Sequence, residues 1–134
     1  MTTPVVYVDR SHVKPGKEAT LRARLAELAD VVEAEVKGAF AYNVYFTPDR
    51  RRMTVVHVQR DARSLERHMK VAGRLFPKFK SLVRLERIDV YGHVSEAVAL
   101  QLQSKVELLG GIVEIHDHAV GFARFERKGR RHPK

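Results

Sequence analysis

The hydrophobic pattern of the chain changes period in a fixed order, and that order is the strongest constraint on its fold. Runs rich in β-branched and aromatic residues, which are typical of strands, lie at residues 5–13, 40–47, 53–60 and 85–94. Apolar residues recur at helical spacing over residues 17–36. A second helix is expected near Ser64, a plausible N-cap, and Gly73 and Pro77 are expected to split it in two. The order strand, helix, strand, strand, helix, strand predicts an α+β, ferredoxin-like βαββαβ domain with both helices on one face of an antiparallel sheet.

A C-terminal extension of the same domain follows the fourth predicted strand. Ser95 is a plausible cap for a third helix that Gly110-Gly111 would end, and residues 112–125 are expected to be extended, with a fifth strand as one form. We divide the chain into a ferredoxin-fold domain at residues 1–94, a helix and strand extension at 95–126 and a basic tail at 127–134. The extension either caps a cavity or enlarges a dimer interface, and its many leucines favour the interface.

Charge and composition restrict the partners of the protein. The formal net charge is +9, but residues 124–134 hold six basic residues and one acid, so more than half of the excess lies at the C-terminal end. We expect a solubilising tail and do not expect nucleic-acid binding, because no aromatic residues alternate with its basic residues. The absence of cysteine excludes disulfides and thiol catalysis. No apolar run is long enough for a membrane span, and a cytoplasmic location without a membrane partner is expected.

Side-chain alternation along the four strands predicts a sheet with two chemically different faces. One parity is apolar, is expected to face the helices, and comprises Val6, Val8, Phe40, Val44, Phe46, Val56, Val58, Ile88 and Val90. The opposite parity is polar and comprises Tyr7, Asp9, Ser11, Asn43, Tyr45, His57, Gln59, Arg87, Asp89, Tyr91 and His93. Simple exposure to water would explain a polar face. The tyrosines and histidines suit partial burial or contact with a ligand better than open solvent.

Three short motifs resemble those of the antibiotic biosynthesis monooxygenase family. They are His12-Val13-Lys14-Pro15-Gly16-Lys17 after the first strand, Gly38 before Tyr42-Asn43-Val44-Tyr45, and Asp61-Ala62-Arg63-Ser64-Leu65-Glu66-Arg67-His68 after the third strand. The resemblance covers about residues 5–94 and implies a dimeric α+β barrel, with a cavity between sheet and helices or at the dimer seam. The family includes cofactor-independent oxygenases of aromatic polyketides, haem-degrading enzymes and members without known activity, so the fold alone does not fix the reaction.

The chain departs from this family at two positions. Many members carry a tryptophan near the end of the third strand, where this chain has Gln59, and the chain contains no tryptophan. The haem-degrading branch uses an asparagine on the first strand, where this chain has Asp9, and only its helix histidine is matched, by His68. Haem degradation of that form is not expected, and no cofactor is expected.

Candidate site residues come from the polar parity and from the second helix. A cofactor-free oxygenase needs a base that generates an electron-rich carbanion and donors that hold the resulting oxyanion. The candidate catalytic residues are Asp9, His57, His68 and Arg87. The candidate substrate-binding residues are Tyr7, Asn43, Tyr45, Gln59, Tyr91 and His93. Two structural alternatives are an Asp9–Arg87 ion pair across the sheet and an ordinary hydrogen-bonded role for His68 on its helix.

His116 and His118 share one side of the last predicted strand. This spacing can bind a metal if His57 or His93 supplies a third ligand. No second spaced pair supports such a site, so we favour a solvated strand or a dimer contact and expect no metal.

The function predicted from these features is small-molecule binding, with a cofactor-independent monooxygenase-type reaction on an aromatic or polycyclic substrate. The alternative is a non-catalytic ligand-binding or sensing homodimer. Nucleic-acid binding through the basic tail is the weakest of the three hypotheses.

Overall fold

A computed structural model describes residues 3–125, and the predicted basic tail lies outside that range. Its elements are β1 (Val5–Val13), α1 (Glu18–Glu35), β2 (Ala39–Phe46), β3 (Arg52–Gln59), α2 (Ala62–Gly73), the 3₁₀ helix η1 (Phe76–Phe79), β4 (Val83–Tyr91), α3 (Glu96–Leu109) and β5 (Ile112–His116). This order confirms the α+β, ferredoxin-like pattern. The division into residues 1–94, 95–126 and 127–134 stays a prediction.

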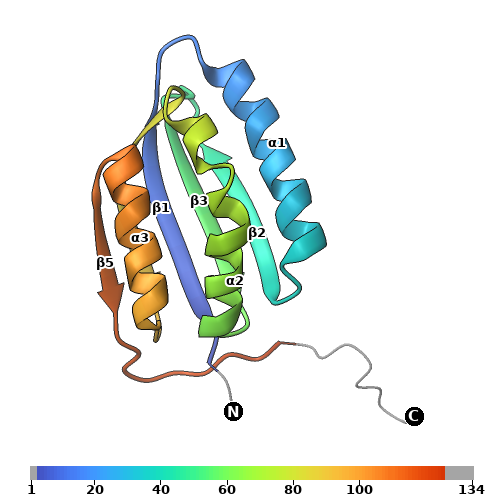
Figure 1. Ribbon diagram of the computed structural model, residues 1–134, viewed down its shortest axis with the longest axis vertical. Helices are drawn as coiled ribbons and strands as arrows, with labels where there is room; N and C mark the ends of the chain where they lie inside the picture. Colours follow the sequence, from blue (N-terminus) through green and yellow to red (C-terminus); the bar gives the residue numbers. More distant parts are fainter. Residues whose placement is uncertain (1–2, 126–134) are drawn as a thin grey trace.

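The five strands form one sheet in the order β2-β3-β1-β4-β5. The pairs β2–β3, β3–β1 and β1–β4 are antiparallel, whereas β5 is parallel to β4. Figure 1 shows α1, α2 and α3 side by side on one face of the sheet. Because parallel neighbours need a crossover connection, α3 is the helix that returns the chain to pair β5 with β4. The predicted fifth strand is therefore confirmed for residues 112–116, while residues 117–125 are irregular.

Helix boundaries follow local capping chemistry. The Asp61 side chain accepts a hydrogen bond from the Ser64 amide at 2.9 Å, so Asp61 is the N-cap of α2 and the prediction of Ser64 was wrong by three residues. Ser95 caps α3 as predicted, by accepting from the Val98 amide at 3.2 Å. The expected split of the second helix is confirmed: α2 ends at Gly73, and Pro77 lies in the first turn of η1.

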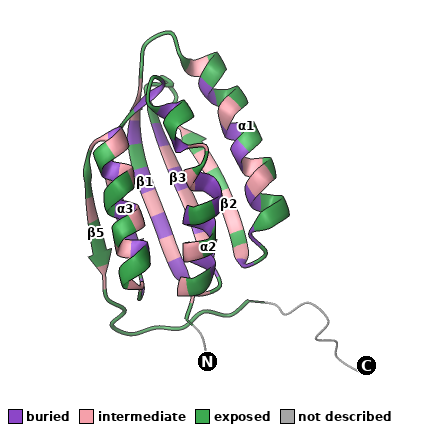
Figure 2. Ribbon diagram, in the orientation of Figure 1, coloured by how far each residue is buried: buried purple, intermediate pink, exposed green. Residues whose placement is uncertain are grey.

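The predicted assignment of faces is wrong for β1 and β3. The register pairs Tyr7 with His57 and Val8 with Val56, and residues paired in this way lie on the same face. Buried and partly exposed residues alternate along both strands (Figure 2). The buried polar set under the helices is Tyr7, Asp9, Ser11, His57 and Gln59. The partly exposed set on the open face is Val6, Val8, Val56 and Val58.

The prediction is right for most of β2 and β4. Their residues on the helix-covered face are Val44, Phe46, Ile88 and Val90. Their residues on the open face are Asn43, Tyr45, Arg87, Asp89 and Tyr91. His93 is exposed and lies beyond the end of β4 at Tyr91, so it belongs to neither face. The predicted polar face is therefore divided between the two sides of the sheet.

Within residues 3–125, no helix combines the length and the apolar character that crossing a membrane requires. The cytoplasmic location stays a prediction.

Candidate functional site

A cavity of about 40 Å³ lies between the helix-covered face of the sheet and the helices of one chain. This volume has room for only a few water molecules. Its polar lining consists of Tyr7, Asp9, Ser11, Tyr42, His57, His68 and Lys105. Its apolar lining consists of Leu25, Leu28, Met53, Val55, Phe76, Phe79, Val83, Leu85 and Leu109. Polar groups thus meet in a predominantly apolar enclosure, which is the usual composition of a small-molecule site.

Asp9, Tyr7 and Lys105 form a buried charged cluster. Asp9 Oδ2 accepts a hydrogen bond from the Tyr7 hydroxyl at 2.6 Å and one from Lys105 Nζ at 3.1 Å. Lys105 Nζ also donates to the Tyr7 oxygen at 2.6 Å and lies 4.2 Å from the centre of the Phe76 ring. The exposed fractions of the side chains are 4% for Asp9 and 11% for Lys105, so the ion pair is largely removed from water.

The second carboxylate oxygen of Asp9 is not used by this cluster. Asp9 Oδ1 is buried and has no hydrogen-bond partner among the described residues. Burial, followed by the neighbouring Asp9 charge, raises the pKa of Tyr7 well above its usual value, so the phenol keeps its proton. The cavity therefore contains a carboxylate with one oxygen held by two donors and one oxygen available to a ligand.

Two neutral histidines complete the polar part of the cavity. The His57 ring is stacked between Tyr7 and His68, at centroid distances of 4.2 and 4.1 Å. Burial, with smaller effects from His68 and Lys105, lowers the pKa of His57 well below 6.5. Burial and the Lys105 charge lower the pKa of His68 to about 3. Both rings are therefore uncharged at neutral pH. Each also has one buried nitrogen, Nε2 of His57 and Nδ1 of His68, that has no hydrogen-bond partner within residues 3–125.

The structure brings some of the predicted site residues together and separates others. The predicted residues that line the cavity are Tyr7, Asp9, His57 and His68. Gln59 is buried beside them and contacts His57 through its amide. The predicted residues that lie elsewhere are Asn43, Tyr45, Arg87 and Tyr91 on the open face and His93 beyond the end of β4.

Two residues of the cavity lining, Lys105 and Tyr42, were not predicted from the sequence. Lys105 lies three residues after Leu102 and four before Leu109, so a charged residue interrupts the buried stripe of α3. That interruption was the available signal. The expected ion pair between Asp9 and Arg87 is not formed, because Asp9 pairs with Lys105 instead. The extension also lines the cavity through Lys105 and Leu109, so it caps the cavity.

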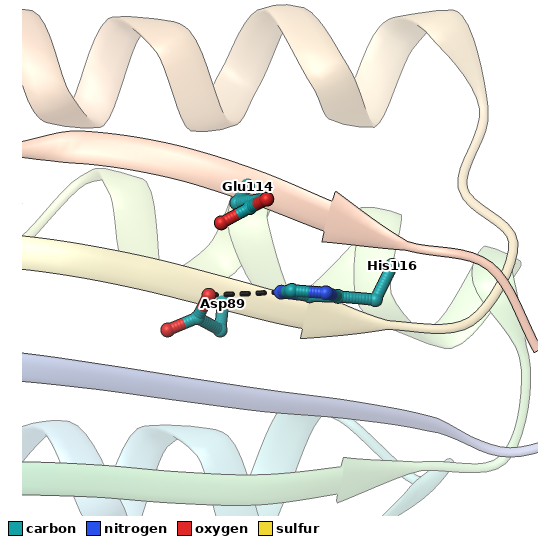
Figure 3. Close-up of side chains that lie close together, drawn as sticks. All are labelled: Asp89, Glu114 and His116. Carbon is teal, nitrogen blue, oxygen red and sulfur yellow. Dashed lines mark hydrogen bonds and ion pairs between the residues drawn. The ribbon is translucent and has the colours of Figure 1, made fainter.

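A second polar cluster lies on the open face where β4 meets β5. Asp89, Glu114 and His116 come close together there, and His116 Nε2 lies 2.9 Å from Asp89 Oδ1 (Figure 3). Arg87 Nη2 donates to Asp89 Oδ1 and to Glu114 Oε1, both at 2.8 Å. The hydrogen bond with Arg87, followed by the smaller effect of the hydrogen bond with His116, lowers the pKa of Asp89 to about 2.

This cluster has the chemistry of an ion-pair network. The Arg87 guanidinium already uses the carboxylate oxygens that a metal would need. Neither residue predicted as an additional metal ligand lies in this cluster. His57 is buried under the helices, and His93 is exposed beyond the end of β4. The network instead ties the parallel strand β5 to β4.

Comparisons with known proteins place these features in context. A family model described as antibiotic biosynthesis monooxygenase matches residues 4–75. No curated protein matches the sequence significantly. Three solved structures illustrate the similarity of the fold.

MupZ from Pseudomonas fluorescens is similar with a TM-score of 0.71 and 15% identity, covering 92% of this chain and 96% of that one. SnoaB, a cofactor-independent oxygenase from Streptomyces nogalater, has a TM-score of 0.58 and 17% identity, covering 69% and 94%. Protein SO0527 from Shewanella oneidensis has a TM-score of 0.59 and 25% identity, covering 68% and 91%. The high coverage with MupZ means that this similarity continues into the α3–β5 extension.

Proposed function

Because the chain belongs to the antibiotic biosynthesis monooxygenase family, we propose that it is a cofactor-independent monooxygenase-type enzyme acting on an aromatic small molecule. The observation that carries the proposal is the buried Oδ1 of Asp9 at the cavity, which has no hydrogen-bond partner in the described part of the chain. A carboxylate in this position is a candidate general base. The similarity of fold to SnoaB supports the same reaction class.

In the proposed reaction, Asp9 Oδ1 removes a proton from the ring methylene of an anthrone-type substrate, a carbon that is conjugated with the carbonyl through the flanking aromatic rings. The charge moves to the carbonyl oxygen, and the Lys105 ammonium is the nearby positive group that stabilises it. The resulting enolate gives one electron to O₂, and the two radicals combine to form a carbon–oxygen bond. Loss of water from this peroxide breaks the O–O bond and leaves a second carbonyl. The substrate gains one oxygen atom and loses two hydrogens, while the other oxygen atom leaves as water.

The size of the cavity adds a requirement to this proposal. About 40 Å³ is far less than the roughly 300 Å³ of a small ligand pocket. An aromatic substrate must therefore separate the side chains that close the cavity. Lys105 and Phe76 belong to α3 and η1, which cover the sheet, so movement of these elements would open the cavity without breaking strand pairing.

Oxygen uptake with dithranol, an anthrone, tests the proposal. We expect one O₂ to be consumed per substrate molecule by protein freed of metals with a chelator, since the proposed chemistry uses only protein side chains and O₂. Carbonyl product should form only when O₂ is present. Tight binding of dithranol without enzyme-dependent uptake would instead favour the non-catalytic ligand-binding alternative.

We also propose that the open face of the sheet is a homodimer interface. All three helices cover the other face, and the open face carries the partly exposed Val6, Val8, Val56 and Val58 together with the exposed Tyr45 and Tyr91. The β1–β3 part of the open face is therefore apolar, and an apolar patch of this kind is normally covered.

Sedimentation at micromolar concentration tests this interface. The wild-type protein is expected to be a dimer. The Val56→Lys variant is expected to be a monomer with the same helix content, because dimerisation would bury the ammonium group of the new lysine in an apolar contact. A monomeric unchanged protein would refute the interface.

A further inference from the structure

The hydrogen-bonding role of His57 is set by residues that do not line the cavity. Gln59 Nε2 lies 2.9 Å from His57 Nδ1, and both side chains are buried. At the other end of the same amide, Gln59 Oε1 accepts from the Ser64 hydroxyl at 2.6 Å. Ser64, Gln59 and His57 therefore form a chain of hydrogen bonds that begins on α2 and ends at the cavity.

The direction of these hydrogen bonds follows from which groups can donate a proton and which can only accept one. With its oxygen turned to Ser64, the Gln59 amide turns its NH₂ group to His57, so Nδ1 must be the acceptor. A neutral imidazole that accepts at Nδ1 carries its proton on Nε2. The reversed amide would leave the Ser64 hydroxyl proton without an acceptor among residues 3–125, because Gln59 Oε1 is the acceptor that this hydroxyl has there.

We propose that Ser64 and Gln59 are positioning residues that lock His57 in the Nε2–H tautomer, so that it donates a hydrogen bond to the substrate in the cavity. His57 Nε2 is buried and has no partner among the described residues, although His57 lines the cavity. A buried donor without a partner is costly unless a ligand or water supplies an acceptor. The stacked Tyr7 and His68 rings on either side hold the imidazole plane in place.

Gly38 makes this arrangement sterically possible. A Cβ atom added to Gly38 would overlap the Ser64 hydroxyl and would lie 2.7 Å from Ser64 Cβ. The Ser64 side chain fits against the backbone just before β2 only because Gly38 has no side chain. The Asp61 cap on the Ser64 amide fixes the backbone of the same residue from the other side.

The Nε2–H tautomer of His57 restricts which compounds can bind in the cavity. This part of the inference rests on the proposed function. Asp9 Oδ1 can only accept a proton, whereas His57 Nε2 can only donate a hydrogen bond. The matching compound presents an acidic C–H or O–H to Asp9 and a carbonyl or enolate oxygen to His57. Enolisable aromatic ketones and hydroxyketones have both groups, while a hydrocarbon or an amine has no oxygen acceptor to offer.

Nitrogen-15 NMR of the histidine side chains tests the tautomer without any ligand. The His57 signals are assigned by their loss in His57→Gln. In the unchanged protein, we expect the proton on Nε2 and none on Nδ1. In Gln59→Glu, both carboxylate oxygens accept, so Nδ1 must become protonated, and kcat/KM for oxygen uptake should fall about 100-fold, as for loss of one oxyanion donor. Gln103→Glu, on the exposed side of α3, is the matched control and should change neither readout.

Ser64 variants provide a second test that does not depend on Gln59→Glu being folded. Ser64→Thr keeps the hydroxyl and should keep the Nε2–H tautomer, whereas Ser64→Ala should allow the amide to turn and produce a mixture of tautomers. Protonation of Nδ1 in the unchanged protein, or an unchanged tautomer in both Gln59→Glu and Ser64→Ala, would overturn the proposal. If the tautomer is as expected but oxygen uptake is absent, only the proposed function fails.

Discussion

Replacing Lys105 with methionine is expected to lower the free energy of unfolding by about 3–5 kcal/mol, the usual cost of removing one partner from a buried ion pair. Methionine keeps an unbranched chain against the Phe76 ring but removes both hydrogen bonds of Nζ. The Asp9 side chain, 4% exposed, would then have only the Tyr7 hydroxyl as a hydrogen-bond donor. Urea unfolding followed by circular dichroism measures the change.

A matched control and a double variant separate the ion pair from general effects of the substitution. Lys70→Met changes an exposed lysine on α2 and should alter the free energy of unfolding by less than about 0.5 kcal/mol. Combining Lys105→Met with Asp9→Asn should cost less than the sum of the two single changes, because the second change removes the unpaired charge. A Lys105→Met protein as stable as the unchanged one would mean that the pair is not buried in solution.

Asp9→Asn is expected to reduce kcat for dithranol-dependent oxygen uptake by about 10²–10⁴-fold, the range that a positioned general base contributes. The amide has nearly the same shape and still offers one oxygen to Tyr7 and Lys105, but it cannot take up the substrate proton. KM should change much less than kcat, because the apolar lining that holds the substrate is untouched.

Asp30→Asn is the matched control for this experiment, since Asp30 is an exposed carboxylate on α1. It should retain the activity of the unchanged protein. An Asp9→Asn protein that turns over dithranol at the unchanged rate would exclude Asp9 as the base and leave the cavity with a binding role.

The elements of the fold could be predicted because their signals are local. The strand at Val5–Val13 was predicted with its observed ends, and the cap at Ser95 was predicted with its observed role. Both depend on residues within a few positions of each other. Which face of β1 and β3 lies under the helices could not be obtained in this way, because it depends on contacts between distant parts of the chain.

The inverted faces of β1 and β3 have one physical cause. Alternation predicts which side of a strand is buried only when the side under the helices is apolar, yet Asp9 and His57 are buried there. Burial of Asp9 is tolerated because Lys105, 96 residues later in the chain, neutralises it. Lys105 lies beyond the resemblance that covers about residues 5–94, so the family motifs do not include the partner of Asp9. Its place in the buried stripe of α3 indicates a buried lysine but not which carboxylate it pairs with.

The origin of Lys105 has a consequence for how such proteins diverge. The base candidate and the histidines come from the segment that the family model matches, whereas the positive charge comes from the extension after it. Exchange of α3 alone would therefore change the charge opposite Asp9 while every strand pairing of β1 to β4 stayed the same. The appended helix is thus the part of this architecture through which a common scaffold can acquire a different chemical preference.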